Sequence, residues 1–371
     1  MKTQKILSVC MVIGATAVQA QTASEKLYPE NTTVRDYAKR DRLLIGGLEY
    51  VSPSQLHENA GMRARLEAEV QNSELRKQGT QSKLNTPSVN AGVAYGWQSL
   101  TLGLQANYLS AENNGSEALA PTEKFESKKF IPELAYTFGA NFTAGIGVEY
   151  TRLDLSEKVD VSNDFNFSYN RPIAGIAYHN PKLEIGLSYT GEVQANDQGT
   201  NTNGRALGLT LAQSPSIDER DVYLPAMGTL YARGNLTDNF SLMSSVSMAR
   251  YDGNVDGAVR LFDNYEYKDR LAAKLIGTYW TTARSRVSIA AEYKGAATTA
   301  VGSEESGLGY RLANLYGGTV EGILSIDRTT YLGLNASYMR GERNDLEPIT
   351  GVQYAGREQS TKFAGSVTVK L

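Results

Sequence analysis

The sequence predicts an all-β protein, an antiparallel transmembrane β-barrel of about fourteen strands with short periplasmic turns and longer extracellular loops. The prediction depends on a signal-like N-terminus, on connections that alternate between very short and long, and on strands in which every second residue is apolar. The same alternation occurs in soluble sandwiches, so the other two features decide between the classes.

Residues 1–20 have the form of a cleaved secretory signal peptide. Lys2 and Lys5 give a positive start, and a short apolar run leads to small residues that end at Ala20. The only cysteine, Cys10, lies inside this segment, so the mature chain would have no disulfide, thiolate metal site or cysteine nucleophile. We expect export through the inner membrane to a Gram-negative outer membrane.

The composition supports a membrane barrel. The 371 residues include 22 tyrosines and 35 glycines but only 10 prolines and 2 histidines. The mean hydropathy is −0.35, and beyond the signal no run reaches the roughly 20 apolar residues that a membrane helix needs. Without the two signal lysines, 35 basic residues face 40 acidic ones. This mild acidity argues against a nucleic-acid partner.

The N-terminal part of the mature chain is expected to precede or plug the barrel. Residues 21–41 read as a polar arm or plug, and residues 42–371 as the outer-membrane barrel. The segments 42–51 and 62–71 both read as strands, and together they would make an odd total. We therefore expect one of them to lie outside the closed ring, and the pattern does not choose between them.

The connections alternate in length along the whole chain. Short ones are expected near 97–98, 139–141, 180–182, 234–239, 281–285 and 326–328, and long polar ones near 52–86, 110–127, 156–165, 197–220, 253–264, 298–308 and 343–354. These thirteen connections give fourteen strands. Bacterial outer-membrane barrels sort their connections in this way, with short turns on the periplasmic side.

Apolar residues on alternate positions are expected to face lipid. In the segment 99–110, Leu100, Leu102 and Leu104 alternate with small or polar residues, and the segments 142–150, 183–189, 287–293, 332–338 and 362–371 repeat the pattern. Tyrosines with the same parity would form two rings at the membrane interfaces, where an amphipathic ring is favoured. The first ring comprises Tyr95, Tyr136, Tyr178, Tyr231 and Tyr279, and the second comprises Tyr108, Tyr150, Tyr189, Tyr293 and Tyr338.

The opposite parity places charged side chains in the lumen. The expected lumen-lining residues are Glu133, Glu149, Glu184, Glu192, Lys274, Glu292, Lys294 and Glu321. Charges inside a barrel must be hydrated or paired, because an unpaired buried charge is costly. They could cross-link the interior and close it, or line a hydrated path that selects solutes by charge.

Several hairpins resemble a known family. The segments "YLPAMGTLYARGNLTDNFSLMSSVSMARYDG" (223–253), "RPIAGIAYHNPKLEIGLSYTGEV" (171–193) and "YKDRLAAKLIGTYW" (267–280) resemble strands of the FadL/TodX-type outer-membrane transporters. The resemblance implies a channel for long-chain fatty acids and other hydrophobic compounds, with an N-terminal hatch in the barrel. The Asn-Pro-Ala motif of that hatch has no counterpart in 28–40, and the chain ends in Leu371 rather than an aromatic residue.

The sequence offers little that could support catalysis. His57 and His179 have no flanking serine or acidic motif, and no phosphate-binding glycine loop or spaced set of metal ligands is present. We expect no enzyme, no metal and no cofactor, with the acidic segment 154–164 as solvated loop charge. The expected partners are outer-membrane lipid and a solute. The expected function, as the resemblance implies, is passage of hydrophobic molecules such as long-chain fatty acids, with a diffusion porin for small polar solutes or a surface-recognition barrel acting through its extracellular loops as alternatives.

Overall fold

The computed structural model describes residues 48–371 except for 59–60, 78–79, 114–121, 140, 159–161, 181, 197–220, 251–265, 268, 283–284, 296–297, 300–313, 328, 347–352 and 371. The expected signal peptide and the arm over 21–41 lie outside these residues. Among the described residues, no helix combines the length and apolar character needed to cross a membrane.

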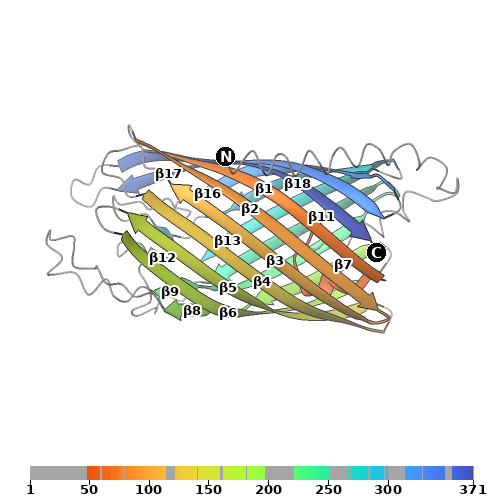
Figure 1. Ribbon diagram of the computed structural model, residues 1–371. Coiled ribbons are helices and arrows are strands. Elements are labelled where there is room, and N and C mark those ends of the chain that lie inside the picture. The colour runs from red at the N-terminus through yellow and green to blue at the C-terminus, as the bar shows by residue number, and fades with distance from the viewer. Residues whose placement is uncertain are drawn as a thin grey trace.

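Fourteen antiparallel strands close into a single barrel, which confirms the predicted fold class (Figure 1). The last strand pairs with the first, from Arg63 opposite Lys370 to Lys77 opposite Gly356. The sheet therefore has no free edge. The strands are β1 (Gly61–Lys77), β2 (Thr80–Trp97), β3 (Leu100–Asn113), β4 (Thr122–Phe138), β5 (Phe142–Lys158), β6 (Ser162–His179), β7 (Leu183–Thr190), β10 (Ala226–Asn235), β11 (Phe240–Arg250), β13 (Arg270–Thr282), β14 (Ser285–Lys294), β16 (Asn314–Ser325), β17 (Thr330–Leu346) and β18 (Gln353–Lys370).

Smaller elements lie outside the ring of strands. β8 (Val193–Asn196) pairs with β9 (Asp221–Leu224), and β12 (Glu266–Tyr267) pairs with β15 (Thr298–Thr299). In Figure 1, β8, β9 and β12 lie at the end of the barrel away from the C-terminus. The 3₁₀ helix η2 (Pro53–Glu58) precedes β1.

The first barrel strand is β1, which contains the segment 62–71, and this confirms that one of the two candidate segments lies outside the ring. The reading of 42–51 as a strand is wrong for the residues of it that the structure describes. Residues 48–51 form a turn and coil, and the preceding residues of that segment are not described. The expected long connection over 52–86 is also wrong, because β1 and the start of β2 occupy it. Residues 61–77 find hydrogen-bonding partners on both sides, in β18 and β2, which explains why they enter the ring. The total of fourteen strands is unchanged.

All six short connections are confirmed at the expected positions, between β2 and β3, β4 and β5, β6 and β7, β10 and β11, β13 and β14, and β16 and β17. Three connections at the opposite end are shorter than expected, because the flanking strands extend into them. One example is the connection over 156–165, where β5 ends at Lys158 and β6 begins at Ser162.

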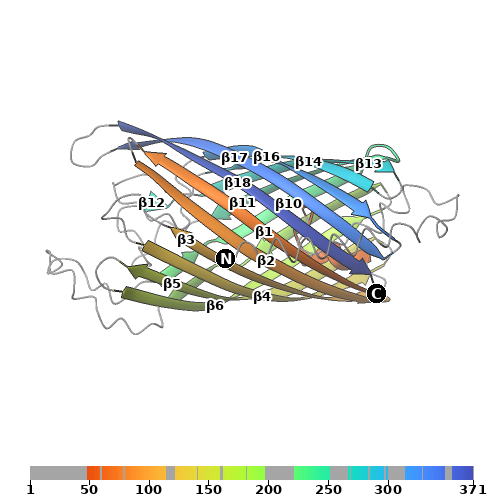
Figure 2. The ribbon, with the colours of Figure 1, turned by 45° about the horizontal axis from the view of Figure 1, so that its top comes forward.

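The wall of the barrel is taller on one side. β1 to β6 with β17 and β18 contain 14 to 18 residues, whereas β7, β10, β11, β13, β14 and β16 contain 8 to 13. A tilted strand of roughly 9–11 residues spans a membrane. The taller strands therefore continue beyond it, at the end with the longer connections (Figure 2).

The exterior of the barrel is apolar and the interior polar, the reverse of a soluble protein. Leu102, Ile146 and Leu334 are exposed on the outer face, while Thr101, Ser188 and Glu321 are buried on the inner face. The structure thus has the transmembrane orientation that the alternation predicted.

Arginine on the outer face should destabilise the barrel in proportion to its depth. Ile289, in the middle of β14, is 61 % exposed, and we expect Ile289→Arg to lower the free energy of unfolding by about 2–4 kcal/mol. Leu236, in the turn between β10 and β11, is equally exposed, and Leu236→Arg should cost about 0–1 kcal/mol. Urea titration in lipid vesicles measures both, and equal losses would contradict the assigned orientation.

Candidate functional site

The lumen contains residues 48–58, the segment that directly precedes β1 in the chain. We call this segment the plug. Its 3₁₀ helix packs against the inner face of β2 to β6. Leu56 is completely buried with Ala94 of β2 and Ala135 of β4, and Tyr50 packs on this cluster. On the other side, Leu48 and Val51 pack against a cluster that includes Tyr231, Met243 and Ile276. The plug therefore contacts both halves of the wall.

Glycines on the inner face make room for the plug. A Cβ atom at Gly145 of β5 would lie 2.5 Å from the backbone of Pro53 and Ser54, and one at Gly103 of β3 would lie 2.9 Å from Leu56 Cδ1. A Cβ atom at Gly175 of β6 would collide with the Ser52 hydroxyl. Glycine inside a strand commonly marks such a close approach.

Polar contacts tie the plug to strands far apart in the sequence. Glu49 forms an ion pair with Arg233 at 2.9 Å and accepts a hydrogen bond from Thr278 Oγ1 at 2.7 Å. The Tyr50 hydroxyl donates to Glu133 Oε2 at 2.8 Å, and Lys274 Nζ donates to the carbonyl oxygen of Leu48 at 2.9 Å. These contacts fix the plug to β4, β10 and β13.

The plug also holds its own backbone in place. Gln55 Oε1 accepts hydrogen bonds from the backbone nitrogens of Val51 and Ser52, at 2.6 and 3.2 Å, and Gln55 Nε2 donates to the carbonyl oxygen of Glu49 at 3.2 Å. A short polar segment inside a barrel needs such partners, because buried backbone groups are costly when unpaired.

The expected lumen residues fall into distinct environments. Glu133, Glu149, Glu184 and Glu321 are buried, while Lys274, Glu292 and Lys294 are half-buried. Glu192 follows the end of β7 and is exposed, so it is not in a barrel strand. Its assignment to the lining was wrong, because the strand ends at Thr190 rather than continuing with the same parity.

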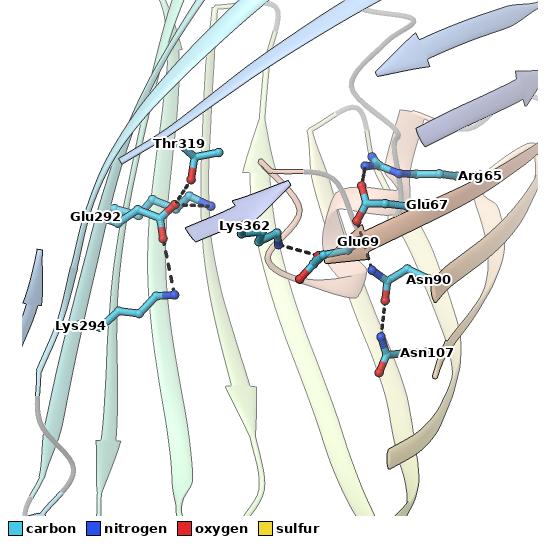
Figure 3. A network of polar contacts seen from close by, with 10 residues as sticks. Arg65, Glu67, Glu69, Asn90, Asn107, Glu292, Lys294, Thr319 and Lys362 are labelled. Atoms are coloured by element: carbon cyan, nitrogen blue, oxygen red, sulfur yellow. Dashed lines mark hydrogen bonds and ion pairs between the residues drawn. The ribbon is translucent and has the colours of Figure 1, made fainter. Parts of the chain in front are cut away.

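Two of these carboxylates, Glu292 and Glu149, are paired with lysines. Glu292 lies 3.8 Å from Lys274 and 3.7 Å from Lys294, and it accepts a hydrogen bond from Thr319 at 2.9 Å (Figure 3). Lys129 lies 3.2 Å from Glu149. Pairing of this kind offsets the cost of removing charges from water.

A second polar network on β1 was not singled out from the sequence (Figure 3). Arg65 forms an ion pair with Glu67, which also accepts a hydrogen bond from Asn90 at 3.1 Å. Asn107 donates in turn to Asn90, and Glu69 lies 2.7 Å from Lys362 of β18. The alternation of charged and apolar residues over 62–71 is the signal that would have indicated this network.

A cavity of about 300 Å³ opens beside this second network. Its lining comprises Arg65 of β1, Asn90, Ala91 and Gly92 of β2, Gln105, Ala106 and Asn107 of β3, and Lys129 and Ile131 of β4. Gln105 also hydrogen-bonds to Glu133, the carboxyl group that holds Tyr50 of the plug. The cavity and the plug are therefore neighbours on the same part of the wall.

The expected tyrosine rings lie on the outer face with one exception. Tyr95, Tyr108, Tyr136, Tyr150, Tyr189, Tyr279 and Tyr338 are exposed, and Tyr178 and Tyr293 are half-buried beside the rings of Phe142 and Tyr316. Tyr231 is 1 % exposed, and its hydroxyl lies 3.2 Å from Ser54 Oγ of the plug. Its expected membrane-facing position was therefore wrong. The adjacent Leu230 is the residue that faces outward.

The histidines show no catalytic arrangement within the described residues. His179, at the end of β6, shares a hydrogen bond of 3.0 Å with Thr143. His57 lies in η2, within the segment 52–86 that was expected to be a long connection. In the described part of the chain, no group of three or more histidine, cysteine, aspartate or glutamate side chains could hold a metal ion.

The glycine recess should be necessary for plug docking. We expect Gly145→Val to release the plug while the barrel still folds, because the new side chain would meet the backbone of Pro53 and Ser54. Overpacking of about 1–3 kcal/mol would speed backbone hydrogen exchange in residues 48–58 by roughly 5- to 150-fold. Mass spectrometry measures this exchange.

Gly322→Val is the matched control, because nothing lies within 4 Å of a Cβ atom at Gly322. This variant should leave the exchange of the plug unchanged. Equal exchange rates in the two variants would show that the recess does not hold the plug.

The chain resembles known proteins in structure but not in sequence. No protein-family model matches the chain, and no curated protein matches it in sequence. The crystal structure of a Pseudomonas aeruginosa FadL homologue superimposes with a TM-score of 0.65 at 13% identity, over 86% of this chain and 93% of that one. The toluene transporters TodX of Pseudomonas putida (TM-score 0.59, 11% identity) and TbuX of Ralstonia pickettii (0.57, 12%) each match over 86% of this chain and 92% of their own. The chain therefore has the barrel fold of the FadL homologue and of these toluene transporters.

Proposed function

We propose that the chain is a channel in a Gram-negative outer membrane that passes hydrophobic small molecules. The observation that carries the proposal is the plug, which is docked in the lumen by contacts to both halves of the wall. The fold shared with the FadL homologue and the toluene transporters supports the solute class. The signal peptide over 1–20 and the arm over 21–41 belong to the same proposal, with the short turns on the periplasmic side.

The plug argues for a controlled path rather than a permanently open pore. It fills space near the short-turn end, where Leu56, Pro53 and Ser52 lie against the glycines of β3, β5 and β6. Since only apolar packing, ion pairs and hydrogen bonds hold it against the inner wall, it can be displaced. A solute that enters from the opposite end would reach the cavity on β1 to β4 before the plug.

A local interruption of the wall offers a sideways route for a hydrophobic solute. The pairing between β4 and β5 stops at Phe130 opposite Tyr150 and resumes at Glu133 opposite Gly147. The two residues of each strand between these pairs are not paired with each other. Pro132, which has no N–H group to donate, lies in this gap. On the other side of β5, Pro172 of β6 lies opposite Val148. Two prolines thus weaken the wall around one point of β5.

The polar interior favours one alternative, a diffusion channel for small polar solutes. Paired charges such as Lys129 with Glu149, and amides such as Asn90 and Asn107, line the lumen. This alternative requires an open aqueous path past the plug.

Single-channel conductance of the refolded mature chain in a planar bilayer separates the two functions. The hydrophobic-solute channel should show little steady conductance, because the plug is docked, and Gly145→Val should raise the conductance while Gly322→Val should not. A sizeable steady conductance of the unmodified chain would instead support the diffusion channel.

Solute uptake tests the substrate class directly. Vesicles with lipopolysaccharide in the outer leaflet should take up a hydrophobic fluorescent probe faster when they contain the chain. Competition by toluene and by a long-chain fatty acid then distinguishes the two classes of hydrophobic solute. Uptake no faster than in protein-free vesicles would contradict the proposal.

A further inference from the structure

The cavity on β1 to β4 combines polar groups that point to a particular kind of ligand. Its inward-facing side chains are Arg65, Asn90, Gln105, Asn107, Lys129 and Ile131. Its volume of about 300 Å³ is at the lower end of the range for ligand pockets, so it suits a molecule with one ring rather than a long chain.

Arg65 retains hydrogen-bonding capacity at this cavity. It is 7 % exposed, and its Nη2 atom is engaged with Glu67. Its other terminal nitrogen, Nη1, is buried without a hydrogen-bond partner among the residues that the structure describes. Arg65 thus borders the cavity with hydrogen-bonding capacity that the described residues leave unused, which favours an oxygen acceptor on a ligand there.

The charges around the cavity are already balanced. Arg65 is paired with Glu67, and Lys129 with Glu149. A further carboxyl group, that of Glu133, lies next to Gln105. An anionic ligand would therefore add a negative charge with no uncompensated cation to receive it, whereas a neutral ligand would not.

The amides complete the description of the ligand. The side chains of Asn90, Gln105 and Asn107 each carry donors and an acceptor, which suits a hydroxyl or carbonyl group. Ile131 and Gly92 provide the apolar part of the lining.

We propose that this cavity binds a small neutral amphipathic molecule through its hydroxyl or carbonyl oxygen, which hydrogen-bonds to the polar side chains of the lining, Arg65 and Asn107 among them. The inference rests on the proposed function and deepens it, because it selects neutral oxygenated compounds among hydrophobic solutes. It excludes a carboxylate from this cavity. Two residues, Gln105 and Glu133, connect the bound molecule to Tyr50 of the plug.

Three molecules of the same size test the proposal: benzyl alcohol, toluene and benzoate. We expect calorimetric titration of the purified full chain in detergent to show benzyl alcohol binding about tenfold more tightly than either of the others, the effect of one net hydrogen bond. Tightest binding of benzoate would overturn the proposal by showing an anion site. Equal binding of toluene and benzyl alcohol, or no binding of any of them, would also overturn it.

Variants locate the binding. Arg65→Met and Asn107→Leu should each abolish the preference for benzyl alcohol over toluene. Arg152→Met is the matched control, because Arg152 forms a comparable ion pair with Asp154, two residues along its strand, on the exposed face. It should retain the preference. Faster gel migration of unheated samples identifies the variants that have folded, and Asn107→Leu tests the site even if Arg65→Met does not fold.

The outcomes also separate this inference from the proposed function. If the chain takes up the hydrophobic probe but binds benzyl alcohol no more tightly than toluene, only the inference about the cavity is contradicted. If the chain binds benzyl alcohol selectively but does not speed probe uptake, the proposed transport function is contradicted and the binding site is supported.

Discussion

The requirement that every backbone N–H and C=O group be paired in lipid underlies the whole structure. Pairing of β1 with β18 meets it by eliminating sheet edges. Once the ring is closed, the strand period of two residues directs one face of each strand to lipid and the other into the lumen. The interior must then accommodate charged and polar side chains, and these provide the contacts that hold the plug.

The features predictable from sequence were those that the membrane imposes locally. Short turns and alternating residues are visible within about twenty residues of chain, so the strand number and most orientations could be inferred. Tyr231 was misassigned because both Leu230 and Tyr231 are suited to the outer face. The charged residue Arg233, two positions later on the same face of the strand as Tyr231, lies inside the barrel and would have indicated the correct parity. The first strand was ambiguous because its identity depends on pairing with β18, some 290 positions away.

The plug could not be located from sequence, since its position depends on surfaces assembled from distant segments. The recess is formed by glycines on three strands, Gly103 of β3, Gly145 of β5 and Gly175 of β6. The polar anchors come from three other strands: Glu133 from β4, Arg233 from β10 and Lys274 from β13. Nothing in the segment 48–58 alone indicates this complementarity. The same network that joins β1 to β2 and β3 also lines the cavity, so these interior side chains belong to both the wall and the cavity.

The order of the elements along the chain has a consequence for biogenesis. The plug precedes β1, so it leaves the export machinery before any strand, yet its binding surface includes residues from β2 through β13. The enclosure is complete only when the final strand joins the first. Docking of the plug is therefore a late event in assembly that depends on nearly the entire chain. A truncated or mispaired barrel would present an incomplete receptor for it, which makes plug docking a natural indicator of a correctly finished molecule.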